Sequence, residues 1–199
     1  MKRTPTCAIL AALALTLGAR PASPQDAVMN SAETINPGNF KLAGYAVRDL
    51  DADETGIVGR VGFGLAEGVD VEGRVASYDG LLYFGGDLEL WLVRDRSSLD
   101  LSVGAGLHRS DFDGGVDVFG IDAFAIVSGH LSRSVELYAA ADLDFERPGE
   151  GIDGYTLAHA VAGLEVAVSD SLDFHFEGGA GLNDRSSDYL AAGLAIYIR

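Results

Sequence analysis

Residues 166–184 read VAVSDSLDFHFEGGAGLND. After the turn SDS, apolar side chains or glycine occupy every second position from Leu172 to Leu182. Acidic residues, a histidine and glycines occupy the positions between them. Successive side chains of a β-strand point to opposite faces of the sheet, so this alternation predicts a strand with one apolar and one polar face.

The same alternation continues along the chain in runs of about ten residues, separated by turn residues. The runs predict strands at about 39–48, 56–65, 69–79, 81–94, 99–109, 116–131, 135–146, 155–168, 172–183 and 188–199. Strands of this length, joined by short turns, are typical of antiparallel barrels that span a membrane. We therefore predict an all-β, transmembrane, up-and-down antiparallel barrel of ten strands, with eight or twelve strands as alternatives.

The two faces of these runs differ sharply in charge. One face is apolar from Phe40 to Ile198 and carries no charged residue, whereas the opposite face carries the charges and all four histidines. The charged face also holds bare glycines such as Gly104 and Gly179, together with aromatic residues such as Tyr83. Small residues beside large ones relieve crowding inside a narrow barrel. We predict that the charge-free face meets lipid and that the charged face lines the lumen.

Four short turns, at 66–68, 94–98, 132–134 and 169–171, share one signature. Each is followed by an aliphatic residue, an acid and an apolar residue. These acids are Asp70, Asp100, Glu136 and Asp173, and together they form the predicted acid ring. We expect the ring just inside the end of the barrel that holds both termini, with Glu89, Glu165 and His130 close by. A ring of carboxylates would favour cations, and the alternative is a set of acids that are solvated or paired with arginine.

Six further residues predict a charged network inside the lumen: Arg60, Arg74, Asp87, Asp142, His159 and Glu177. Buried charges must be paired or hydrogen-bonded, so a structural network is favoured over a substrate site. Each histidine falls on a different predicted strand, and no H-x-x-x-H spacing occurs. The sequence therefore predicts no catalytic residue, no metal ligand and no cofactor.

The first residues have the plan of a secretory signal peptide. Lys2 and Arg3 precede the apolar stretch 8–17, which is too short to span a bilayer as a helix. We predict a signal peptide over residues 1–22, with the cleavage position left open, and a flexible periplasmic lead-in over 23–38. The barrel domain then covers residues 39–199. Cys7, the only cysteine, would leave with the signal peptide.

The acidic charge balance restricts the partners. The chain has a net charge of −16, and Lys41 is the only lysine beyond the predicted signal peptide. Binding to nucleic-acid phosphates needs a basic surface, so nucleic acid is excluded as a partner.

Two stretches carry a family resemblance: VGFGLAEGVDVEGRV (61–75) and VAVSDSLDFHFEGGAGLND (166–184). Both resemble hairpins of bacterial outer-membrane β-barrel proteins, and among these the outer-membrane transporters assigned to a phenol-degradation pathway. The end of the chain, YLAAGLAIYIR, is similar to the terminal assembly signal of that superfamily, although Arg199 stands where an aromatic residue is usual. The resemblance implies an outer-membrane location, with outer-membrane lipid, lipopolysaccharide and the barrel-assembly machinery as partners.

These patterns predict an outer-membrane barrel with a structural or narrow passive-permeation role, and weak cation preference if it conducts. The first alternative is a soluble secreted β-barrel that binds a small apolar ligand and turns its charge-free face inward. The second is an outer-membrane enzyme that uses an inward histidine such as His159.

Overall fold

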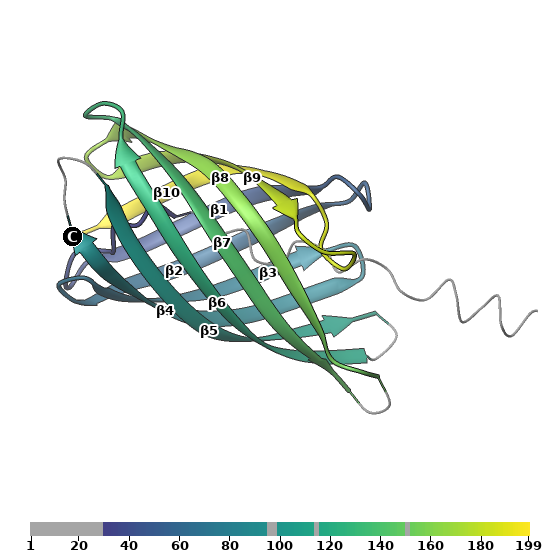
Figure 1. The fold of residues 1–199 in the computed structure, drawn as a ribbon. Coiled ribbons are helices and arrows are strands. Elements are labelled where there is room, and N and C mark those ends of the chain that lie inside the picture. The colour runs from purple at the N-terminus through teal and green to yellow at the C-terminus, as the bar shows by residue number, and fades with distance from the viewer. Residues whose placement is uncertain (1–29, 95–98, 114–115, 150–151) are drawn as a thin grey trace, which may run out of the picture.

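The computed structural model describes residues 30–94, 99–113, 116–149 and 152–199. It is a closed barrel of antiparallel strands (Figure 1). The strands are β1 Phe40–Asp49, β2 Thr55–Ala66, β3 Val69–Tyr78, β4 Leu81–Arg94, β5 Asp100–Phe112, β6 Val116–His130, β7 Val135–Pro148, β8 Tyr155–Ser169, β9 Leu172–Gly181 and β10 Tyr189–Ile198. The prediction of a ten-stranded barrel is confirmed. The largest difference in a strand boundary is at the end of β5, predicted at residue 109 and found at Phe112.

Each strand pairs with its neighbours in the sequence, and β1 pairs with β10 to close the barrel. At this seam Phe40 lies opposite Ile198, and Asp49 lies opposite Tyr189. Closure leaves no strand edge, so every strand has hydrogen-bonding partners on both sides. No helix in the described part of the chain is long and apolar enough to cross a membrane.

The charge-free face of the strands is the outer surface of the barrel. Leu88 in the middle of β4 is 42% exposed and Ile57 in β2 is 70% exposed. The charged face is turned inward, where Glu177 and His175 are fully buried. The predicted orientation is confirmed, and it is opposite to the arrangement that a soluble barrel with an apolar ligand pocket requires.

Aromatic rings inside the barrel lie across glycines of the neighbouring strand. A Cβ added at Gly163 would overlap the ring of Tyr138, and one added at Gly179 would overlap the ring of Tyr189. In each pair the tyrosine and the glycine are directly opposite in the sheet register. The bare glycines of the inner face therefore provide the space that the rings occupy.

Tight turns occur at both ends of the barrel. β2–β3 and β3–β4 are joined by tight turns in which Gly68 and Gly80 have φ values of 74° and 75°, a region that glycine enters without steric cost. In the loop DLDADET, the Asp49 carboxylate accepts hydrogen bonds from the backbone N–H groups of Asp51 (2.9 Å) and Ala52 (2.8 Å). The first strand begins and the last strand ends at the same end of the barrel, as predicted for an even number of strands.

Candidate functional site

The lumen of the barrel is strongly acidic. The buried acids are Asp49, Asp70, Glu72, Asp87, Glu89, Asp100, Asp122, Glu136, Asp142, Asp144, Glu146, Asp173 and Glu177. Among the described residues, the buried lysines and arginines are Lys41, Arg60 and Arg74. Three cations cannot neutralise all of these carboxylates one for one, so the interior retains a large excess of carboxyl groups.

Lys41, Arg60 and Glu72 form one ion-pair group. The Lys41 ammonium contacts Glu72 Oε1 directly, and Arg60 Nη1 lies 3.5 Å from Glu72 Oε2. In the register Lys41 is opposite Gly62, and Gly62 is opposite Glu72. Because Gly62 has no side chain, lysine on β1 can reach across β2 to the carboxylate on β3.

Arg74 forms the second ion-pair group. Its Nε lies 3.1 Å from Asp87 Oδ2, and its Nη2 donates a hydrogen bond to Asp122 Oδ2 at 3.1 Å. Its guanidinium also lies over the Tyr83 ring, 5.9 Å from the centroid. Two strands, β4 and β5, lie between Arg74 and Asp122. The Asp122 carboxylate extends over β5 at Gly106, where a Cβ would lie 2.7 Å from Asp122 Oδ1. One arginine thus joins β3, β4 and β6 across the lumen.

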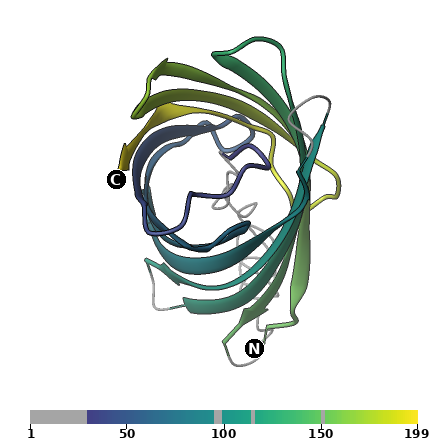
Figure 2. The ribbon, with the colours of Figure 1, turned by 90° about the vertical axis from the view of Figure 1, so that its left-hand side faces the viewer.

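Residues 30–38 lie at the end of the barrel where β1 begins and β10 ends, with 31–35 largely buried, and Figure 2 shows this segment crossing the opening. The Ile35 N–H donates to Asp70 Oδ2 at 2.7 Å, and the Ala32 N–H donates to Ser128 Oγ at 3.1 Å. Ile35 also fills the space over Gly62. We expected this part of the chain to belong to a flexible lead-in. In the structure, the wall of the barrel supplies hydrogen-bond acceptors for the backbone N–H groups of Ala32 and Ile35.

Comparisons with known proteins place this geometry among membrane barrels. Neither a family model nor a curated protein matches the sequence. Among solved structures, an outer membrane channel from Pseudomonas putida is similar, with a TM-score of 0.55 and 9% identity over 84% of this chain and 98% of that one. The NanC porin is also similar, with a TM-score of 0.53 and 8% identity over 79% of this chain and all (100%) of that one. This chain has the fold of the bacterial outer-membrane β-barrels.

In this barrel, the residues of the acid ring are all buried within the lumen. Each stands at the first or second position of its strand, as predicted. Glu89 is opposite Asp70, and Glu136 is opposite both His130 and Glu165. The ring is covered in part, because Asp70 binds the Ile35 N–H. Asp100 accepts a hydrogen bond of 3.1 Å from Trp91 Nε1.

The six residues of the predicted lumen network are all buried, but they fall into four groups. Arg60 belongs to the first ion-pair group described above, and Arg74 and Asp87 belong to the second. Asp142 and His159 face each other across β7 and β8, with 4.0 Å between Oδ2 and Nδ1. Glu177 accepts hydrogen bonds from the hydroxyls of Tyr138 (2.8 Å) and Tyr189 (2.7 Å).

Sequence reasoning missed the ion-pair partners of the two arginines, namely Lys41 and Glu72 in the Arg60 group and Asp122 beside Arg74. All three belong to the inward face that the alternation identifies. Their pairing depends on the strand register, which the alternation alone does not specify.

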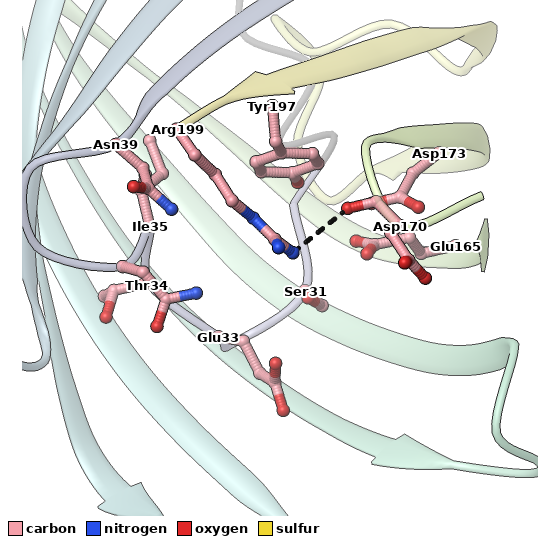
Figure 3. Close-up of a pocket in the computed structure, with 11 residues that line it drawn as sticks. Ser31, Glu33, Thr34, Ile35, Asn39, Glu165, Asp170, Asp173, Tyr197 and Arg199 are labelled. Atoms are coloured by element: carbon pink, nitrogen blue, oxygen red, sulfur yellow. Dashed lines mark hydrogen bonds between the residues drawn. The ribbon is translucent and has the colours of Figure 1, made fainter. Parts of the chain in front are cut away.

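A pocket opens beside the C-terminus, at the end of the barrel crossed by residues 30–38 (Figure 3). Its wall includes the carboxylates of Glu33, Glu165 and Asp173. Arg199 lies across it and donates a hydrogen bond of 3.4 Å to the backbone carbonyl of Asp170. This mouth of the barrel is therefore acidic, like the lumen behind it.

Proposed function

We propose that this chain is an integral outer-membrane β-barrel with a narrow passive-permeation role and a preference for cations. The observation that carries the proposal is the acid-dominated lumen inside a barrel whose outer surface is apolar. A path lined by carboxylates attracts cations and repels anions at close range. The two similar structures described above, an outer membrane channel and a porin, support a permeation role.

The lumen is closely filled in the described part of the barrel. Glu72, Glu177 and His175 are at most 2% exposed, whereas a wide aqueous channel would leave such inward side chains in contact with water. Residues 30–38 cover one end. We therefore expect low conductance, limited by this segment and by the ion pairs behind it.

Ion selectivity in planar lipid bilayers tests the proposal. Under a salt gradient, the reversal potential of the refolded full-length barrel is expected to have the sign of a cation-selective channel. A variant that neutralises the acid ring (Asp70→Asn, Asp100→Asn, Glu136→Gln, Asp173→Asn) is expected to lose most of this selectivity. Anion selectivity in both proteins would contradict the proposal.

A matched control neutralises the same number of exposed acids: Glu67, Asp113, Asp117 and Asp184. These carboxylates lie in loops or at strand ends in contact with solvent, where salt screens their fields beyond about 8–10 Å. We expect the control to keep the selectivity of the unmodified barrel. Equal losses in both variants would mean that net charge, and not the ring, sets the preference.

Removal of residues 30–38 tests their role as an obstruction. The shortened barrel is expected to show a higher single-channel conductance with unchanged sign of selectivity, because the lumen wall is intact. The carboxyl groups of Asp70 and Glu72 would then face water in place of the segment. An unchanged conductance would place the limiting constriction deeper, at the Arg74 ion pairs.

The location and partners are part of the same proposal. Export through a signal peptide over residues 1–22, which lie outside the described residues, would bring the chain to the outer-membrane assembly machinery, and the apolar belt would then contact outer-membrane lipid and lipopolysaccharide. The short-turn end would face the periplasm, as in other barrels of this kind. Cell fractionation checks this, since the folded barrel should pellet with the outer membrane and migrate differently in gels with and without heating.

A further inference from the structure

One wall of the lumen gathers histidine and carboxylate side chains from four adjacent strands. We refer to His108 (β5), Asp122 (β6), Asp142, Asp144 and Glu146 (β7) and His159 (β8) as the histidine–acid cluster. All six are buried. Within it, one ligand atom each from His108, Asp122 and Asp144 lie within 4.8 Å of one another, and the same holds for Asp142, Asp144 and His159. Asp144 belongs to both triads.

Short contacts tie the cluster together. His108 Nε2 is 2.9 Å from Glu146 Oε1, and His108 Nδ1 is 3.4 Å from Asp122 Oδ1. Space for the imidazole comes from Gly120, where a Cβ would overlap the ring. The other carboxylate oxygen of Glu146, Oε2, is buried without a hydrogen-bond partner in the described part of the chain. The cluster therefore offers ligand atoms that are already held close together.

The opposed carboxylates of the cluster would be stabilised by a bound cation. Asp122 and Asp144 are directly opposite each other in the register of β6 and β7. Like charges in such cross-strand positions are destabilising, and burial makes their repulsion stronger. Arg74 contacts Asp122, but it also pairs with Asp87. The lumen as a whole has far more buried acids than lysines and arginines.

We propose that the histidine–acid cluster binds a divalent first-row transition-metal ion such as Zn²⁺, with Asp144 as the ligand common to both triads. Imidazole nitrogens and carboxylate oxygens are the usual protein ligands of Zn²⁺ after thiolate. The two histidines favour such an ion over Ca²⁺ or Mg²⁺, which take oxygen ligands. A bound ion would neutralise the opposed carboxylates and link strands of the wall.

The sequence did not reveal this site because its two histidines come from strands that are not adjacent, β5 and β8. His108 and His159 are brought to the same wall only by the register of β5 to β8. The site does not depend on conduction, so it can be tested on the folded barrel in detergent whether or not the barrel forms a channel.

Zinc titration of the full-length refolded barrel, freed of metal by a chelator, tests the proposal. We expect stoichiometric binding by calorimetry, with the metal retained through gel filtration and measured by elemental analysis. Asp144→Asn is expected to lower the affinity at least about tenfold, because loss of even an indirect supporting group commonly costs 10- to 100-fold. Glu89→Gln is the matched control. Glu89 on β4 is also a buried carboxylate of the lumen, where it accepts a hydrogen bond from the Ser102 hydroxyl, and its variant should bind zinc like the unmodified barrel.

Cobalt substitution provides a readout that needs no variant. Co²⁺ added to the unmodified barrel should give visible d–d absorption with nitrogen and oxygen ligands, and excess Zn²⁺ should abolish it. Absence of both cobalt absorption and retained zinc would overturn the proposal. Equal zinc affinity in the Asp144→Asn and Glu89→Gln variants would overturn it as well. If Asp144→Asn does not fold, His108→Gln and His159→Gln replace it in the comparison with Glu89→Gln.

Discussion

At the scale of single residues, the lumen depends on buried charges that are shared between partners. Glu72 is the clearest case, since it contacts both Lys41 and Arg60 and is 2% exposed. Removing one member of a buried ion pair leaves the others without compensation, at a cost of several kcal/mol. The side chains here are held by their partners more than by apolar contacts.

Glu72→Gln is therefore expected to lower the free energy of unfolding by about 3–5 kcal/mol, because two buried cations lose their carboxylate. Denaturant unfolding in detergent or lipid vesicles measures the change. Glu67→Gln is the control. Glu67 pairs with Arg94 at 2.6 Å on the surface, where the side chain of Glu67 is 85% exposed, so its loss should cost at most about 1 kcal/mol. Equal losses in the two variants would contradict this account.

The residue scale also shows where sequence reasoning ends. The inward direction of Arg60, Arg74, Asp87, Asp142 and His159 follows from alternation with a period of two, and the structure confirms it. Their ion-pair partners cannot be predicted from this alternation, because the partner carboxylate lies on another strand and its position depends on the register between the strands. The acid ring could be placed because a short turn fixes the residues that follow it.

At the scale of elements, the turn residues and the alternation of polar and apolar residues were enough to predict where the strands lie. Runs such as the one from Val135 end at turn residues, so their limits could be read directly. Residues 30–38 could not be placed, since they show no alternation and the acceptors of their backbone N–H groups, Asp70 and Ser128, lie on distant strands. The packing of Tyr138 on Gly163 and of Tyr189 on Gly179 shows why the inner face carries so many glycines.

Gly163→Ala is expected to destabilise the barrel by about 1–3 kcal/mol, because its methyl group would overlap the Tyr138 ring and force it to move. Gly44→Ala on β1 is the control, since a Cβ there meets no atom within 4 Å. That change should leave the stability unaltered or raise it by up to about 1 kcal/mol. Unfolding midpoints in the same detergent compare the two, and a Gly163→Ala barrel as stable as Gly44→Ala would refute the packing argument.

At the scale of the whole molecule, the barrel is inverted relative to a soluble protein. Its outer surface is a continuous apolar belt, with large side chains such as Phe84, Leu88 and Phe176 between 42% and 48% exposed, and its charges are inside. An exposed apolar surface of this extent marks a contact face, and in the proposed function it is covered by lipid. Along the belt the outer face of the strands therefore carries no charge, and the charged residues there are gathered on the inner face.

The cost of a charge on the belt should depend on its depth in the bilayer. Leu88→Arg, in the middle of β4, is expected to destabilise the barrel by about 2–4 kcal/mol in phospholipid vesicles. Leu131→Arg, directly after the end of β6, should cost at most about 1 kcal/mol. Equilibrium unfolding in vesicles measures both. Similar values at the two positions would indicate that the outer surface does not meet a bilayer as proposed.

The seating of Tyr138 on Gly163 has a consequence for assembly. Sliding β7 along β8 by one residue would expose the wrong face, but sliding it by two residues would preserve the faces and so escape that penalty. After such a two-residue slip, Tyr138 would stand opposite Val161 or Glu165, neither of which leaves room for its ring. The Tyr138 ring and Gly163 therefore disfavour a two-residue shift in the β7–β8 register, which the alternating pattern alone would allow.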